Sequence, residues 1–276
     1  GLLIDGDNLM PITEILPDSE QAQELANYLP QALPYRLRPD GNVLIINASS
    51  GQDVLLALAS GVADVTAVEE NEHVIEIVRD EFGAATGDLF NDERVTLINE
   101  AGRVYSRKNL SEEFDLAVIA LNGQHRPVQS GAYSLSGDYS TTTEAVEDYL
   151  KVLSADGLLV VTRWLQTPPS ESARAFATVA VALINSGRDP AQHLIAFRTL
   201  RTMTILAAAK PFTPIELDVA RTFLNERGFD AVYLPDLKEE ELNRFNVLPK
   251  ASYHDLFSQI LQQPEELLDS YQYDIR

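Results

Sequence analysis

The sequence predicts an α/β protein with a doubly wound, mainly parallel sheet that ends in an antiparallel hairpin. Apolar runs alternate with helical patterns from about residue 43 onward, which is typical of parallel strands joined by right-handed helical crossovers. Runs such as 43–46 and 116–121 are apolar throughout, as expected for strands covered on both faces. Two later runs, 194–198 and 203–207, lie so close together in the sequence that they must pair antiparallel.

The N-terminal part of the chain is organised differently from the rest. Residues 2–4 predict a short strand and residues 18–29 predict a helix, and Pro34 and Pro39 then mark a linker. We therefore expect an N-terminal strand and helix segment over residues 1–40. A Rossmann-like domain with a C-terminal helical extension then occupies residues 41–276.

The elements of the second part are predicted by short apolar runs and by the spacing of apolar residues. The predicted strands are 43–46, 65–68, 95–98, 116–121, 158–162, 194–198, 203–207 and 232–234. The predicted helices are 54–61, 74–82, 141–153, 171–185, 213–228 and 252–268. The clearest helix ends are the capping box of Thr213 and Glu216, with Pro214 in the first turn, and the stop at Gly228.

Composition and charge narrow the class of protein. The chain of 276 residues is 45% hydrophobic and 23% charged, which is ordinary for one large globular domain or for a domain with a small appendage. This acidic protein has 42 acidic and 21 basic side chains and a net charge of −21, which repels phosphate backbones, so nucleic acid is not expected as a partner. The same charge favours cationic ligands, although it serves solubility equally well.

Cysteine, histidine and long apolar runs exclude several other functions. The absence of cysteine excludes disulfides, thiolate catalysis and cysteine zinc sites, and the four histidines lack metal-ligand spacing, so no metal is expected. No apolar run reaches the ~18 residues that span a bilayer, and no signal peptide is visible in the given sequence. We expect a cytoplasmic protein or the soluble domain of a membrane protein. The chain begins inside a strand-like run, so we also expect that sequence before it is missing.

The first candidate binding loop follows the run 43–46. In a doubly wound sheet, ligands bind beyond the carboxyl ends of the strands, which are here the loops after residues 46, 68, 98 and 121. Small residues let the backbone approach a ligand, and the following helix presents free N–H groups. The candidate binding residues of this loop are Asn47, Ser49, Gly51 and Asp53. Because only Gly51 is a glycine, an ordinary tight turn explains the loop equally well.

Acidic residues follow the next two strands. Glu69 lies 18 residues after Gly51, a spacing at which a carboxylate commonly accepts the ribose hydroxyls of a nucleoside. In the third loop, Glu100 and Gly102 are candidates for contact with an adenine edge. A plain strand-to-helix turn made by Gly102 is the alternative.

The fourth loop, from residue 122 to residue 140, is long and rich in glycine. Loops of this length are often lids or binding loops. Asn122 and Asp138 are the candidate catalytic residues, and His125 is a weaker candidate for a general base. Asp138 precedes a predicted helix, so a favourable interaction with the helix dipole is its alternative role.

Several segments together resemble one family of enzymes. They are similar to the spermidine synthase-like branch of the class I S-adenosylmethionine-dependent methyltransferase superfamily, especially its bacterial members that are often fused to membrane helices. The segments that carry the resemblance are 33–39, 43–54, 65–69, 131–136, 143–145, 157–164, 211–214 and 273–276.

The resemblance implies a Rossmann-like class I methyltransferase fold and a nucleoside-binding domain. It implies S-adenosylmethionine or decarboxylated S-adenosylmethionine as the donor substrate, with transfer of an aminopropyl or methyl group to an acceptor such as a polyamine. It also implies that Glu69 holds the ribose and that Gly51 lies in the glycine loop. A homodimer, and fusion to membrane helices outside this chain, are compatible with it.

The sequence also departs from the family. Asn47, Ser49 and Ser50 replace glycines, and Asn122 stands where a catalytic aspartate is expected after the fourth strand. An amide cannot take a proton from an attacking amine. Two hypotheses therefore stay open: a transferase with a changed pocket, and a catalytically degenerate ligand-sensing or interaction domain of a larger membrane protein. A nicotinamide-dependent dehydrogenase is disfavoured because the sequence lacks a G-x-G-x-x-G loop.

Overall fold

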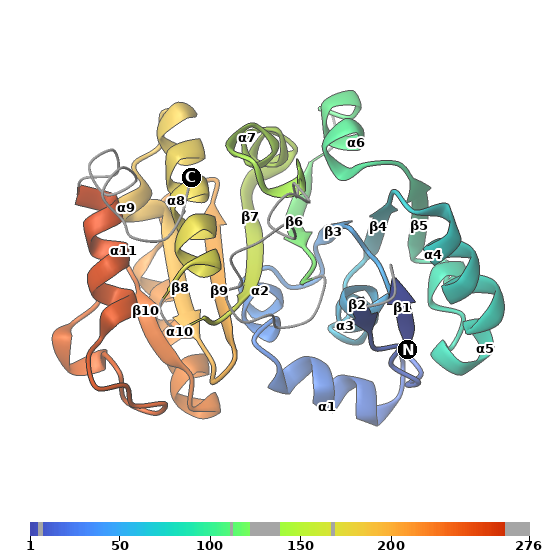
Figure 1. Cartoon of the computed structure of the whole chain (residues 1–276), viewed down its shortest axis with the longest axis horizontal. Helices are drawn as coiled ribbons and strands as arrows, with labels where there is room; N and C mark the ends of the chain where they lie inside the picture. Colours follow the sequence, from blue (N-terminus) through green and yellow to red (C-terminus); the bar gives the residue numbers. More distant parts are fainter. Residues whose placement is uncertain (5–7, 111–112, 122–138, 167–168, 263–276) are drawn as a thin grey trace. The chain divides into compact units, whose positions relative to one another are not determined.

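The computed structural model describes residues 1–4, 8–110, 113–121, 139–166 and 169–262. Its main sheet has eight strands in the order β10-β8-β9-β7-β6-β3-β4-β5, and a two-stranded sheet pairs β1 with β2 (Figure 1). The chain forms two compact units, the first comprising Gly1–Gln124 with Lys151–Val160 and the second His125–Leu150 with Val161–Arg276. The predicted α/β class, a parallel sheet that ends in antiparallel strands, is confirmed.

The first unit contains the parallel strands. These are β3 (Asn42–Ile46), β4 (Asp64–Glu69), β5 (Val95–Asn99) and β6 (Phe114–Ile119). The chain passes from β3 to β4 to β5 in one direction and then returns to place β6 on the other side of β3. Strand order therefore reverses between β3 and β6, and a doubly wound sheet binds its ligands at such a point.

Helices and short helical turns connect these strands. They are α3 (Gln52–Ala59), α4 (Glu72–Glu76), the π-helical turn η1 (Ile77–Glu81), α5 (Gly83–Thr86), the 3₁₀ turn η2 (Leu89–Asn91) and α6 (Gly102–Lys108). Residues 43–46 of β3 are fully buried, because helices cover both faces of a parallel sheet.

The N-terminal segment adds a hairpin and two helices to the first unit. These elements are β1 (Leu2–Ile4), β2 (Asn8–Met10), α1 (Glu20–Tyr28) and α2 (Ala32–Leu37). Ser19 caps α1 by accepting the Ala22 N–H at 3.2 Å, and α1 packs against α3. The predicted linker around Pro34 is wrong, because α2 forms there. Pro34 is the third residue of α2, where the missing N–H has no helical partner to lose.

The second unit contains the antiparallel strands and most of the later helices. These elements are η4 (Tyr139–Thr141), α7 (Thr143–Lys151), α8 (Glu171–Asn185), α9 (Pro190–His193), β8 (Leu194–Arg198), β9 (Thr202–Ala208), α10 (Pro214–Arg227), β10 (Asp230–Tyr233), η5 (Glu239–Glu241) and α11 (Ser252–Gln262). The predicted hairpin of β8 and β9 is antiparallel, and the predicted capping box of Thr213 and Glu216 is present. Helices α8 and α11 pack together through Phe176 and Phe257, whose rings stack with centroids 4.0 Å apart.

Strand β7 (Leu153–Trp164) differs from the prediction. The sequence analysis placed this strand at residues 158–162, after the pair Asp156-Gly157, which is typical of a turn. However, β7 begins three residues before Asp156 and runs through Gly157. The Phe114 N–H donates to the Val152 carbonyl at 2.9 Å, so main-chain bonding begins before the apparent turn signal. In the described part of the chain, no helix is both long enough and apolar enough to cross a bilayer.

Candidate functional site

The carboxyl ends of β3, β4 and β6 are joined by main-chain hydrogen bonds. The Ala48 N–H donates to the Val68 carbonyl at 3.0 Å, which ties the loop after β3 to the end of β4. The Ala120 N–H donates to the Ile46 carbonyl at 3.1 Å, which ties the end of β6 to the end of β3. The ends of three of the four strands that precede the selected loops therefore meet at the point where strand order reverses.

The loop after β3 has an unusual backbone. Asn47, Ser49 and Gly51 all have left-handed conformations, with φ of 59°, 56° and 83°. Glycine adopts this conformation without strain and asparagine tolerates it, whereas serine is strained there by about 1–2 kcal/mol. Left-handed residues in tight turns gather backbone N–H groups into a concavity that binds anions. The loop therefore keeps the geometry of a glycine loop with only one glycine.

The carboxylate of Glu69 is the anion at this loop. Its Oε2 accepts the Ser49 N–H at 2.9 Å and its Oε1 accepts the Asn71 N–H at 2.9 Å. The side chain is 6% exposed, and burial raises its pKa, while the backbone N–H groups of Asn71 and Ser49 act in the opposite direction. Each oxygen keeps a second lone pair, so the fixed carboxylate can still accept a ligand hydroxyl.

The loop after β5 places Asn99, and not Glu100, against the end of β4. The Asn99 amide donates to the carbonyl oxygens of Glu69 and Glu70 at 3.0 and 3.2 Å. The carboxylate of Glu100 instead forms an ion pair with Lys108 of α6. Nothing in the sequence indicated which of these two neighbouring side chains lies against β4, because that depends on the residue at which β5 ends.

The two predicted glycines have different surroundings. A Cβ added at Gly102 would lie 2.5 Å from Cγ2 of Ile46, so this glycine lets α6 approach β3 closely. A Cβ added at Gly51 would lie 3.4 Å from Leu89 and 3.6 Å from Phe90, both buried apolar residues of η2. Leu89 and Phe90 therefore pack against Gly51, and sequence patterns did not indicate these two residues.

Asp53 is buried near a tyrosine. It is the second residue of α3, is 9% exposed, and burial raises its pKa to about 6. Tyr35 of α2 is 6% exposed, and its pKa is raised first by burial and then by the charge of Asp53. Asp53 therefore lies close enough to Tyr35 of α2 for its charge to act on the tyrosine, which the sequence analysis did not anticipate, and its role in binding stays a prediction.

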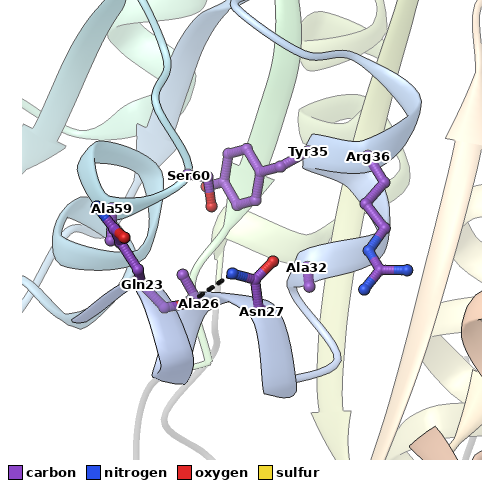
Figure 2. Close-up of a pocket in the computed structure, with 8 residues that line it drawn as sticks. All are labelled: Gln23, Ala26, Asn27, Ala32, Tyr35, Arg36, Ala59 and Ser60. Atoms are coloured by element: carbon purple, nitrogen blue, oxygen red, sulfur yellow. Dashed lines mark hydrogen bonds between the residues drawn. The ribbon is translucent and has the colours of Figure 1, made fainter. Parts of the chain in front are cut away.

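A separate pocket of about 210 Å³ opens between α1, α2 and the C-terminal end of α3 (Figure 2). The Asn27 amide donates to the Gln23 carbonyl at 2.8 Å along its edge. Its lining residues are Gln23, Ala26, Asn27, Ala32, Tyr35, Arg36, Ala59 and Ser60. None of the predicted site residues lines it.

Three of the predicted residues have no described position, and one residue that was not predicted contacts the loop after β3. Asn122, His125 and Asp138 lie outside the described residues, so their roles stay predictions. Met10 of β2 was not predicted: its sulfur accepts a hydrogen bond from the Ser49 hydroxyl at 2.6 Å. Within the described ranges, no group of three or more histidine or acidic side chains is arranged to hold a metal ion.

Known proteins resemble this chain in structure and not in sequence. No protein-family model matches the chain, and no curated protein matches its sequence. A probable spermidine synthase from Corynebacterium glutamicum is similar in structure at 16% identity and a TM-score of 0.50, covering 78% of this chain and 75% of that one. The chain has the Rossmann-like fold of class I methyltransferases. At this identity the similarity shows the methyltransferase fold and nothing finer.

Two further solved structures with this methyltransferase fold are similar. A spermidine synthase in complex with the transition-state analogue AdoDATO has 17% identity and a TM-score of 0.49, covering 91% of this chain and 74% of that one. Human methyltransferase-like protein 13 in complex with SAH has 12% identity and a TM-score of 0.47, covering 75% of this chain and 89% of that one.

Proposed function

We propose that this chain is a spermidine synthase-like transferase domain that binds S-adenosylmethionine, or its decarboxylated form, at the loop after β3. One observation carries the proposal. The buried carboxylate of Glu69 is fixed at the end of β4, against a left-handed loop at the point where strand order reverses.

The chemistry of the donor suits these residues. The ribose hydroxyls of the donor can donate hydrogen bonds to the carboxylate oxygens of Glu69, each of which keeps a second lone pair. The net charge of −21 attracts a sulfonium cation at long range.

Either group transfer proceeds by displacement at a carbon bound to the sulfonium sulfur. In aminopropyl transfer, the acceptor nitrogen forms a bond to the aminopropyl carbon, the carbon–sulfur bond breaks, 5′-methylthioadenosine leaves, and the new ammonium loses a proton. In methyl transfer, the acceptor bonds to the methyl carbon and S-adenosylhomocysteine leaves. Because the leaving group is already good, the protein mainly positions the acceptor and takes the proton.

The acceptor side of the proposal rests on predicted residues. We assign the proton to Asp138 and a hydrogen-bonding role to Asn122, which has no basic carboxylate. A polyamine is the proposed acceptor class, because the acidic chain attracts polycations. We further propose that the domain works in the cytoplasm, as a homodimer and as part of a protein fused to membrane helices.

A catalytically degenerate domain is the second candidate, and two observations favour it. Ser49 is strained where glycine would be relaxed, and both oxygens of Glu69 already accept backbone N–H groups. In this case the domain senses a ligand or contacts a partner, without transferring a group.

Calorimetric titration tests donor binding. S-adenosylmethionine, its decarboxylated form and 5′-methylthioadenosine are titrated into wild type, Glu69→Gln and Glu70→Gln. Glu70 is the matched control because it is the exposed neighbour of the same residue type. We expect micromolar binding in wild type, at least 10-fold weaker binding in Glu69→Gln, which is about 1.4 kcal/mol, and unchanged binding in Glu70→Gln. No binding of any of the three compounds overturns the transferase proposal.

Product analysis then separates transfer from sensing. Each donor is incubated with a set of polyamines, and the nucleoside products are measured by mass spectrometry. 5′-Methylthioadenosine formed from the decarboxylated donor shows aminopropyl transfer, and S-adenosylhomocysteine formed from S-adenosylmethionine shows methyl transfer. Binding without either product, across a broad set of acceptors, supports the degenerate domain.

A further inference from the structure

We infer that residues 10–17 form a strap that covers the loop after β3 and must lift at its Met10 end before a nucleoside reaches Glu69. This inference rests on the proposed function, because it concerns access to the same loop. Figure 1 shows β2, which ends at Met10, beside the connection from β3 to α3.

At its first end the strap contacts the loop directly. The Ser49 hydroxyl donates to the Met10 sulfur at 2.6 Å, and the two residues are only 7% and 6% exposed. The Ser49 N–H in turn donates to Oε2 of Glu69 at 2.9 Å. Met10 thus covers the residue whose backbone holds the proposed ribose-binding carboxylate. A thioether is a weak acceptor, so this hydrogen bond is readily given up.

At its other end the strap is firmly attached. Pro17 is buried, and a Cβ added at Gly87 would lie 2.8 Å from Cδ of Pro17 and 2.9 Å from Cδ2 of Leu16, so the chain passes closely over this glycine. The next residue, Asp18, forms an ion pair with Arg94 at 3.2 Å. Helix α1 begins immediately afterwards with Ser19 as its cap. The Pro17 end is therefore the pivot.

Between its two ends the strap has no regular structure. Residues 11–16 form neither helix nor strand, and Pro11, Glu14 and Leu16 are exposed. Segments with few buried contacts open locally at a low cost in free energy. Met10 is the last residue of β2 and pairs with Leu2 of β1, so lifting the Met10 end moves the β1–β2 hairpin with it and leaves the attachment at Pro17 in place.

An engineered disulfide tests the strap, because the chain has no cysteine of its own. In a Met10→Cys/Ser49→Cys variant, mild oxidation is expected to join the two residues, as seen by the loss of two hydrogens in the mass of the linked peptide. We expect the oxidised form to bind 5′-methylthioadenosine at least 10-fold more weakly than the same protein after reduction. The two single cysteine variants, oxidised in the same way, are the controls.

A Met10→Ala variant provides an independent measurement. Without the methionine side chain, we expect the association rate of 5′-methylthioadenosine to rise several-fold. Glu14→Ala, an exposed change in the middle of the strap, is the matched control and should leave the rate unchanged.

Each outcome bears on the strap. Equal affinity before and after reduction contradicts the covering role. A cysteine side chain is shorter than that of methionine, so if no disulfide forms, the association rate of Met10→Ala decides, and an unchanged rate overturns the strap. If neither wild type nor the reduced variant binds a nucleoside, the proposed function fails by itself. In that case hydrogen exchange at the Ser49 amide still tests the strap: faster exchange in Met10→Ala supports the cover, and an unchanged rate overturns it.

Discussion

Replacing Asp53 by asparagine should stabilise the protein at neutral pH more than at acid pH. Burial raises the pKa of Asp53 from its ordinary value of 3.8 to about 6. The folded protein therefore holds this proton more tightly than the unfolded chain does. Stability is lost as the pH rises from the unfolded value through the folded value, and the whole loss is present above pH 6.

The size of the effect follows from the shift. A change from 3.8 to about 6 corresponds to about 3 kcal/mol once both states are ionised. Roughly half of this loss is already present at pH 5, because the unfolded carboxyl is mostly ionised there. The stability difference between Asp53→Asn and wild type should therefore grow by about 1.4 kcal/mol between pH 5 and pH 8.

Urea denaturation followed by circular dichroism, at several pH values from 5 to 8, measures this difference. Subtracting the wild-type stability at each pH removes the contribution of the groups that titrate equally in both proteins. Asp64→Asn, at an exposed position, controls for the loss of one negative charge from an acidic protein. A difference between Asp53→Asn and wild type that stays constant with pH would refute the argument, because desolvation of the carboxylate would then have no measurable effect.

Three further predictions concern packing and backbone strain. Gly102→Ala should destabilise the protein by about 1–3 kcal/mol in urea, and less in an Ile46→Ala background, because the new Cβ would lie 2.5 Å from the Ile46 side chain. Ser49→Gly should be more stable than Ser49→Ala by about 1 kcal/mol, because Ser49 has a φ of 56°, which glycine adopts more easily than alanine. At a site with negative φ the order of the two variants would be reversed. An alanine variant that melts at a higher temperature than the glycine variant would contradict this. Arg198→Met should destabilise the protein by about 3–5 kcal/mol in urea denaturation. The reason is that the carboxylate of Asp230, which is 1% exposed, would lose the guanidinium that lies 3.1 Å away. A loss of stability below about 1 kcal/mol would contradict this prediction.

The sequence predicted most strands and helices because their signals are local. Buried parallel strands are apolar throughout, and helix ends carry capping residues, so β3 and α10 lie where expected. The two errors arose where a local signal was overridden. Pro34 suggested a linker, but proline is tolerated in the first turn of α2. The pair Asp156-Gly157 suggested a turn, but β7 had already begun.

The candidate site could be predicted in part for the same reason. The position of Glu69 follows from the end of β4, a feature that the apolar pattern marks. The contact of Met10 with Ser49 joins residues 39 apart in the sequence, and no periodic pattern encodes it. The surroundings of Asp53 were missed because they depend on α2, the helix that the proline signal concealed. An acid in the first turn of a helix usually suggests an exposed partner of the dipole, whereas this one is buried near Tyr35.

The strained loop bears on the choice between the two proposed functions. A serine in a left-handed conformation persists only where its surroundings hold it, and the partners here are Glu69 on its N–H and Met10 on its hydroxyl. If the loop serves only to join β3 to α3, Ser49→Gly should relieve strain without altering nucleoside binding. If the loop shapes a donor site, the same change frees space beside the carboxylate and should alter affinity as well as stability. Measuring both quantities on this one variant therefore separates a binding loop from a structural turn, whichever group the domain transfers.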